Sequence, residues 1–81
     1  MTARVYVTPK STVFDPQGQT IRAALNAHGH ETVSEVRQGK YFEIRLVEGL
    51  DTDAASAEID DIAREVLSNP VIEEYRIEII P

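Results

Sequence analysis

Few side chains in this sequence have the types and the spacing that catalysis or metal binding requires. His28 and His30 lie two positions apart and could share one metal ion. A zinc site, however, takes three or four protein ligands, and the chain has no cysteine and no further histidine to supply them. Such histidines more often follow the end of a helix, where positive charge is favourable. We therefore expect no metal in this chain.

Two short acidic groups also admit a chemical interpretation. Asp51-Thr52-Asp53 resembles the start of a calcium loop but lacks the glycine and the distal glutamate of that loop, so a helix cap is the better account. Glu73-Glu74 offers paired carboxylates, yet it closely follows the turn signal Asn69-Pro70 and is more typical of a solvated strand entry. Phosphate-binding glycine motifs and a serine nucleophile elbow are absent. We expect no catalytic and no cofactor-binding residue.

Composition narrows the class of protein. The chain has 81 residues, which predicts a single domain over residues 1–81 with a small core that a partner subunit often completes. A net charge of −6 argues against nucleic acid or an anionic membrane as the main partner. The sequence holds no apolar run of bilayer length, its N-terminus does not resemble a signal peptide, and cysteine is absent. We expect a cytoplasmic protein.

The first half of the chain predicts a strand and then a helix. Val5 and Val7 alternate with Tyr6 within Arg4–Thr8, which is the period of a half-buried strand. Asp15-Pro16 then forms a helix start, with Asp15 as N-cap. Gly18 in the first helical turn costs about 1 kcal/mol relative to alanine. Either another segment approaches the backbone closely at Gly18, or the glycine has no structural role.

The stretch Val33–Val47 predicts two strands that meet in a hairpin at Gln38-Gly39-Lys40, with Gly39 supplying a positive φ. A second helix follows the cap at Asp51, and a last strand covers Tyr75–Ile80. The buried stripe of this second helix is expected to consist of Ala55, Ile59, Ile62, Ala63 and Val66.

Six elements in the order βαββαβ predict an α+β sandwich of ferredoxin-like type, with an antiparallel four-stranded sheet and both helices on one face. Alternation places one set of apolar residues beneath the helices: Val5, Val7, Phe42, Ile44, Leu46, Ile77 and Ile79. The opposite face is too apolar for full solvation and too charged for a monomer core, so we expect the chain to dimerise through this face of the sheet. Its apolar members are Tyr6, Tyr41, Val47 and Ile80, among the charged residues Glu43, Arg45, Arg76 and Glu78.

Four segments in order carry a resemblance to a known family: Val5–Lys10, Val13–Gly18, Val36–Glu43 and Leu67–Tyr75. Over essentially the whole chain the sequence resembles the PurS family, the small subunit of phosphoribosylformylglycinamidine synthase. Departures are small: Phe14 stands where the family often has leucine or another apolar residue, and the tail after Ile80 is short.

The resemblance implies a non-catalytic subunit of a cytosolic purine-biosynthesis complex. It implies a homo-oligomer (a dimer, possibly a tetramer), a large synthetase subunit that binds ATP and magnesium, and a glutaminase subunit that releases ammonia. A subunit of this kind helps the two enzymes to assemble, so that ammonia passes from glutamine to formylglycinamide ribonucleotide. The residues that we expect to contact the partner subunits are Asp15, Gln17, Gly18, Arg37, Gly39, Lys40 and Tyr75. The alternative is that Asp15 serves only as a helix cap, Gly39 only as a turn and Tyr75 only in packing.

Two other classes of protein share the βαββαβ order. An ACT-like regulatory domain would bind an amino acid at a dimer interface, and the run of family motifs counts against it. An RNA-recognition domain would carry aromatic residues on its sheet, but Gly39–Ile44 does not match the RNP1 pattern and the net charge has the wrong sign.

Overall fold

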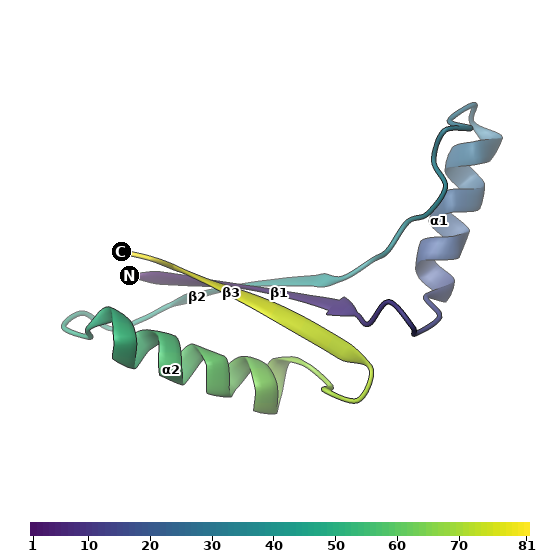
Figure 1. The fold of residues 1–81 in the computed structure, drawn as a ribbon. Coiled ribbons are helices and arrows are strands. Elements are labelled where there is room, and N and C mark those ends of the chain that lie inside the picture. The colour runs from purple at the N-terminus through teal and green to yellow at the C-terminus, as the bar shows by residue number, and fades with distance from the viewer.

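The computed structural model describes residues 1–81 and has the predicted α+β class. Three strands form one antiparallel sheet in the order β2-β1-β3 (Figure 1). The elements in chain order are β1 (Thr2–Pro9), α1 (Pro16–Ala27), β2 (Lys40–Arg45), α2 (Thr52–Ile62), a π-helical turn η1 (Ala63–Leu67) and β3 (Glu73–Ile80). No helix is both long enough and apolar enough to cross a membrane.

The core lies between one face of the sheet and α2. Alternation along β1 buries Ala3, Val5 and Val7, which meet Ile59 and Ala63 from α2 and η1. Asp51 caps α2, since its carboxylate accepts a hydrogen bond from the Ala54 backbone N–H at 2.8 Å. The prediction of this apolar sheet face is confirmed, because the remaining predicted members all pack against the same cluster: Phe42, Ile44, Leu46, Ile77 and Ile79.

The buried stripe of the second helix is confirmed except at its end. Ala55, Ile59 and Ala63 are buried, but Val66 is 74% exposed and Leu67 packs against the core instead. The physical reason is η1: the Ser68 N–H bonds to the Ala63 carbonyl five residues earlier, at 3.0 Å. A π-turn adds one residue to the helical period, so the inward position moves from 66 to 67.

The predicted hairpin is wrong. Residues 33–39 form no strand, and the chain runs on from this segment into β2 without turning at Gln38-Gly39-Lys40. Gly39 has no positive φ. A Cβ at Gly39 would overlap the Val7 carbonyl oxygen, so the glycine serves a close approach to β1 and not a turn. The sheet therefore has three strands where four were expected.

The prediction that both helices cover one sheet face is also wrong. Helix α2 packs on the sheet, whereas α1 projects from the end of the sheet where β1 stops (Figure 1). The molecule extends 51 Å along its longest axis and 14 Å along its shortest. We call residues 10–38 the arm, and the three strands with α2 and η1 the body.

Candidate functional site

The point where the arm leaves the body, which we call the junction, is organised by a buried carboxylate. Asp15 caps α1: its Oδ1 accepts from the Gly18 N–H at 3.1 Å, and its Oδ2 accepts from the Gln38 N–H at 2.8 Å. The Gln38 N–H, the Gly18 N–H and the positive charge of Arg37 hold the pKa of Asp15 below its usual value. The ionised carboxylate thus ties the start of α1 to the segment that precedes β2.

Gly18 lets the two parts of the arm touch. A Cβ at Gly18 would overlap the Val36 carbonyl oxygen and would lie 2.8 Å from Asp15 Oδ2. The close approach that the first-turn glycine suggested is therefore present. Together with Gly39 against β1, it sets the spacing of three backbone segments that meet at the junction.

Arg37 contributes to the junction from inside rather than as an exposed charge. Its Nη2 donates to the carbonyl oxygens of Lys10 at 2.6 Å and Pro9 at 3.4 Å, and its side chain is 28% exposed. Lys40 lies at the start of β2, where its Nζ is 3.8 Å from Glu73 Oε2 and its side chain is 62% exposed. Arg37 thus holds the arm, while Lys40 presents its charge to solvent.

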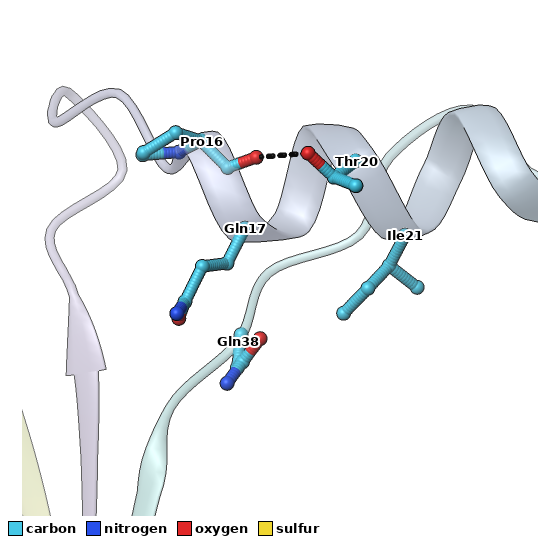
Figure 2. Close-up of a pocket in the computed structure, with 5 residues that line it drawn as sticks. All are labelled: Pro16, Gln17, Thr20, Ile21 and Gln38. Carbon is cyan, nitrogen blue, oxygen red and sulfur yellow. Dashed lines mark hydrogen bonds between the residues drawn. The ribbon is translucent and has the colours of Figure 1, made fainter.

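A groove opens beside the junction, between α1 and the chain at Gln38. It has a volume of about 370 Å³ and is lined by Pro16, Gln17, Thr20, Ile21 and Gln38. Figure 2 shows the side chains of Gln17 and Ile21 pointing from α1 toward the strand-like segment that carries Gln38. Uncharged amides with one apolar side chain suit contact with a protein surface better than they suit an anion. Sequence reasoning found Gln17 but missed the rest, because the groove depends on the unpredicted course of the arm.

Tyr75 lies apart from the junction residues. Its hydroxyl donates to Asp60 Oδ1 at 2.8 Å and so links β3 to α2 within the body. The hydrogen bond to Asp60 and partial burial raise the pKa of Tyr75. The structure brings the other predicted contact residues together at or beside the junction: Asp15, Gln17, Gly18, Arg37, Gly39 and Lys40.

The sheet face opposite α2 is open. Tyr6 and Tyr41 pair across strands with their ring centroids 5.2 Å apart, and the Arg76 guanidinium lies 4.2 Å from the Tyr6 centroid. Val47 is 75% exposed just beyond β2, and Ile80 is half-buried opposite Thr2 at the end of β3. This face combines aromatic, apolar and charged groups, as the alternation predicted.

The described residues bring no three His, Cys, Asp or Glu side chains into a group that could hold a metal ion. His28 and His30 are both exposed beyond the end of α1. The junction consists of backbone groups, a carboxylate in a helix cap and a guanidinium on carbonyl oxygens. Its chemistry is that of positioning and recognition.

Residues 2–81 match the family described as PurS: Phosphoribosylformylglycinamidine (FGAM) synthase. A subunit PurS of phosphoribosylformylglycinamidine synthase from Synechocystis is 42% identical over 94% of this chain and 75% of its own length. The corresponding subunit of Mycobacterium leprae is 41% identical over 93% of this chain and 90% of its own length. The chain belongs to the PurS family.

Solved structures agree with this assignment. The PurS of Methanocaldococcus jannaschii has a TM-score of 0.83 and 34% identity, covering 95% of this chain and 92% of that one. A structure of PurLQS from Thermotoga maritima gives a TM-score of 0.84 and 31% identity over 95% of this chain and 93% of that one. These PurS relatives give no support to the ACT-like alternative.

Proposed function

We propose that this chain is the non-catalytic small subunit of a phosphoribosylformylglycinamidine synthase. It assembles the large synthetase subunit with the glutaminase subunit, so that ammonia from glutamine reaches formylglycinamide ribonucleotide. The observation that carries the proposal is the match to PurS proteins over nearly the whole chain, including the PurLQS structure. ATP and magnesium bind in the synthetase partner, the complex works in the cytoplasm, and residues 1–81 act as one domain.

In this proposal the junction and its groove form the contact surface for the partner subunits. Gln17 and Lys40 have exposed side chains that reach a partner directly. Asp15, Gly18 and Gly39 act through the shape that they give to the arm, and so does Arg37. Tyr75 acts from the body, where it holds β3 against α2 at the same end of the sheet.

The proposal includes a homo-oligomer, a dimer or a dimer of dimers. The open sheet face with Tyr6, Tyr41, Val47 and Ile80 is one contact surface between copies. Aromatic residues and arginine on one exposed face are the composition that protein interfaces favour.

Reconstitution tests the assembly role. The synthetase and glutaminase subunits of the same organism are assayed with and without this chain, with glutamine or with ammonium as nitrogen donor. We expect glutamine-dependent turnover to require the chain, and the ammonium-driven reaction to depend on it much less. Glutamine-dependent turnover that is indifferent to the chain would contradict the proposal.

A pair of variants tests the contact surface. Gln17→Arg places a long charged side chain in the groove, whereas Gln19→Arg makes the same change at an exposed position of α1 outside the groove lining. We expect Gln17→Arg to weaken binding to the partner subunits at least tenfold and Gln19→Arg to leave it unchanged. Equal effects of the two variants would remove the groove from the proposed surface.

A further inference from the structure

Exposed apolar side chains gather at the end of the body where β1 stops and β3 begins. Val66 in η1 and Val71 and Ile72 in the turn before β3 are all exposed, Val71 by 79%. Phe14, which is 71% exposed, belongs to the loop after β1. The Lys10 N–H of this loop donates to the Ile72 carbonyl at 2.9 Å, so the two loops are joined at the same end of the sheet (Figure 1). We call these four exposed residues the apolar end.

The π-helical turn η1 is the reason that Val66 faces outward. A regular helix would direct position 66 toward the core, but Leu67 takes that place after the extra residue of the π-turn. The turn is locked twice, because both the N–H and the hydroxyl of Ser68 donate to the Ala63 carbonyl. The exposure of Val66 is therefore fixed by the backbone. Turns of this kind occur frequently at functional sites.

The turn between η1 and β3 holds Val71 and Ile72 in place without burying them. The Asn69 carbonyl accepts from the Ile72 N–H at 3.0 Å and from the Glu73 N–H at 2.7 Å, and Asn69 Oδ1 accepts from the Val71 N–H at 3.1 Å. Glu73 Oε1 in turn accepts from the Asn69 N–H at 2.8 Å. A protein that covers this turn leaves none of these donors unpaired and has little left to order, which lowers the cost of binding.

Acidic side chains surround the apolar end. Asp60, Asp61 and Glu65 share a single basic partner, Arg64, and Glu74 is exposed at the start of β3. Two apolar ends placed face to face would set these like charges against each other, which argues against a second copy as the occupant. A complementary partner combines an apolar centre with basic side chains around it.

Of the two enzymes in the proposed function, the synthetase has the ligands that call for a basic surface. ATP and formylglycinamide ribonucleotide both carry phosphate groups, and an enzyme that binds them gathers positive charge around its site. Glutamine has no net charge, so the same reasoning places no excess of positive charge on the glutaminase. The acidic rim of the apolar end therefore complements the synthetase better than the glutaminase.

We propose that the apolar end is the surface through which this chain binds the synthetase subunit. Val71 and Ile72 enter an apolar patch of the synthetase that is rimmed by lysine and arginine, and Val66 and Phe14 extend the contact on either side. The groove beside α1 lies on the arm, so it stays accessible to the second enzyme. This inference rests on the proposed function, since it names the partner that meets this surface.

Calorimetric titration of the isolated synthetase subunit with the chain tests the apolar contact. The double variant Val71→Thr/Ile72→Thr removes apolar groups but keeps β-branched side chains, so the backbone preference of the turn is retained. Val47→Thr is the matched control, because Val47 is 75% exposed beyond β2, at the end of the sheet away from the junction. We expect the Kd of the double variant to rise at least tenfold and that of the control to stay unchanged. Circular dichroism verifies that each variant is folded.

Unchanged synthetase binding by the double variant, or an equal loss in Val47→Thr, would overturn the inference. The proposed function would still stand if the wild-type chain supports glutamine-dependent turnover. A wild-type chain that neither binds the synthetase nor supports this turnover would contradict both. Light scattering is run on each variant, and a lower molar mass for the double variant than for wild type would assign the apolar end to contacts between copies instead.

The acidic rim has a test of its own. Asp61→Asn/Glu65→Gln removes two negative charges beside the apolar end, and Glu48→Gln/Asp53→Asn removes two at the far end of α2; all four residues are exposed. We expect the first pair to slow association with the synthetase several-fold at low salt and to reduce its dependence on salt. The second pair should have a smaller effect. Equal effects would contradict a basic rim on the partner surface.

Photochemical cross-linking identifies the occupant directly and does not depend on a loss of binding. The chain has no native cysteine, so Val71→Cys and Val47→Cys each take a single benzophenone label. With synthetase and glutaminase both present, we expect labelled Val71→Cys to form an adduct with the synthetase and labelled Val47→Cys to form none. An adduct of Val71→Cys with the glutaminase or with a second copy, in place of the synthetase, would overturn the inference.

Discussion

Different kinds of interaction stabilise the body and the arm. The body buries six hydrophobic residues between a sheet face and a helix. The arm buries only Asp15 and Gly18, a charged side chain and a residue without one. Burial of apolar surface is the dominant favourable term in folding, so the body is stabilised mainly by its own core. The arm instead depends on hydrogen bonds and on close backbone contacts at the junction.

The body and the arm are therefore suited to different roles. Hydrogen bonds fix direction but add little net stability, because the unfolded chain makes equivalent bonds with water. The junction therefore fixes the direction of the arm without burying its apolar side chains, and Ile21 stays 39% exposed. Substitutions in the body should therefore change the free energy of unfolding, and substitutions at the junction should change the order of the arm and its association.

The largest effect is expected from the body. Ile59→Ala removes the largest fully buried side chain of the core and should lower the free energy of unfolding by about 2–5 kcal/mol. Urea unfolding followed by circular dichroism measures it, at one fixed protein concentration because self-association would shift the midpoint. Val66→Ala on the neighbouring turn is the matched control, and we expect a change within about 0.5 kcal/mol there. Equal losses at both positions would contradict the shift of the inward face by the π-turn.

A smaller loss of stability is expected at Gly18, where α1 touches the segment that precedes β2. Gly18→Ala places a methyl group against the Val36 carbonyl and should destabilise by about 1–3 kcal/mol. Helix propensity alone predicts the opposite sign, a gain of about 1 kcal/mol. Hydrogen exchange of the α1 amides, compared with those of α2, shows whether the loss is confined to the arm. A stabilised variant with an unchanged arm would show that the close contact is absent in solution.

The Asp15 carboxylate should make the order of the arm depend on pH. Its pKa is lowered in the folded chain, so its contribution is present above its unfolded value, about 3.9, and is lost as the pH falls through the lower folded value. We expect exchange of the α1 amides to accelerate several-fold below about pH 4, after correction for the intrinsic rate. Protection of α2 should change less over the same interval.

Asp15→Asn sharpens this experiment, because asparagine still caps the helix but its amide nitrogen cannot accept from the Gln38 N–H. The variant should loosen the segment before β2 more than it loosens the start of α1, and it should lack the acid-dependent step. An acid-dependent step of wild-type size in the variant would assign the effect to another group.

The smallest effect is expected at Tyr75, which joins two elements of the body. Tyr75→Phe removes the hydrogen bond to Asp60 and should lower Tm by less than Gly18→Ala does, with the arm unaffected. Because the folded pKa of Tyr75 is raised, the wild-type chain should lose part of this stability above its unfolded value of about pH 10. The variant should lack that alkaline loss. A loss of partner binding without a loss of stability would instead place Tyr75 on the contact surface.

The sequence predicted what local patterns control. Alternation locates the apolar face of the sheet, and local signals identify Asp15 and Asp51 as caps. At Gly18 the sequence leaves two interpretations open, and the structure shows the close approach. Each of these depends on residues within a few positions of one another, or on one face of one element.

The features that the sequence did not predict depend on contacts between segments that lie far apart in the chain. A glycine between two strand patterns usually marks a turn, but the same residue type also permits close packing, which is what Gly39 does against β1. Propensity does not distinguish these two uses. Because the segment before Gly39 does not fold back as a strand, α1 lies away from the sheet. The groove beside α1 and the free edge of β2 both result from this course of the chain. The π-turn gave no sequence signal either, since its extra residue shows only in the hydrogen bond from Ser68.

The free edge of β2 has a consequence for the newly made chain. An unpaired strand edge can pair with strands of any protein nearby and so begin aggregation. Lys40, Glu43 and Arg45 are all exposed along this short strand. Charges of mixed sign on an edge disfavour indiscriminate pairing, because most incoming strands would bury one of them without a counterpart. The exposed charges of β2 therefore protect its unpaired edge against aggregation.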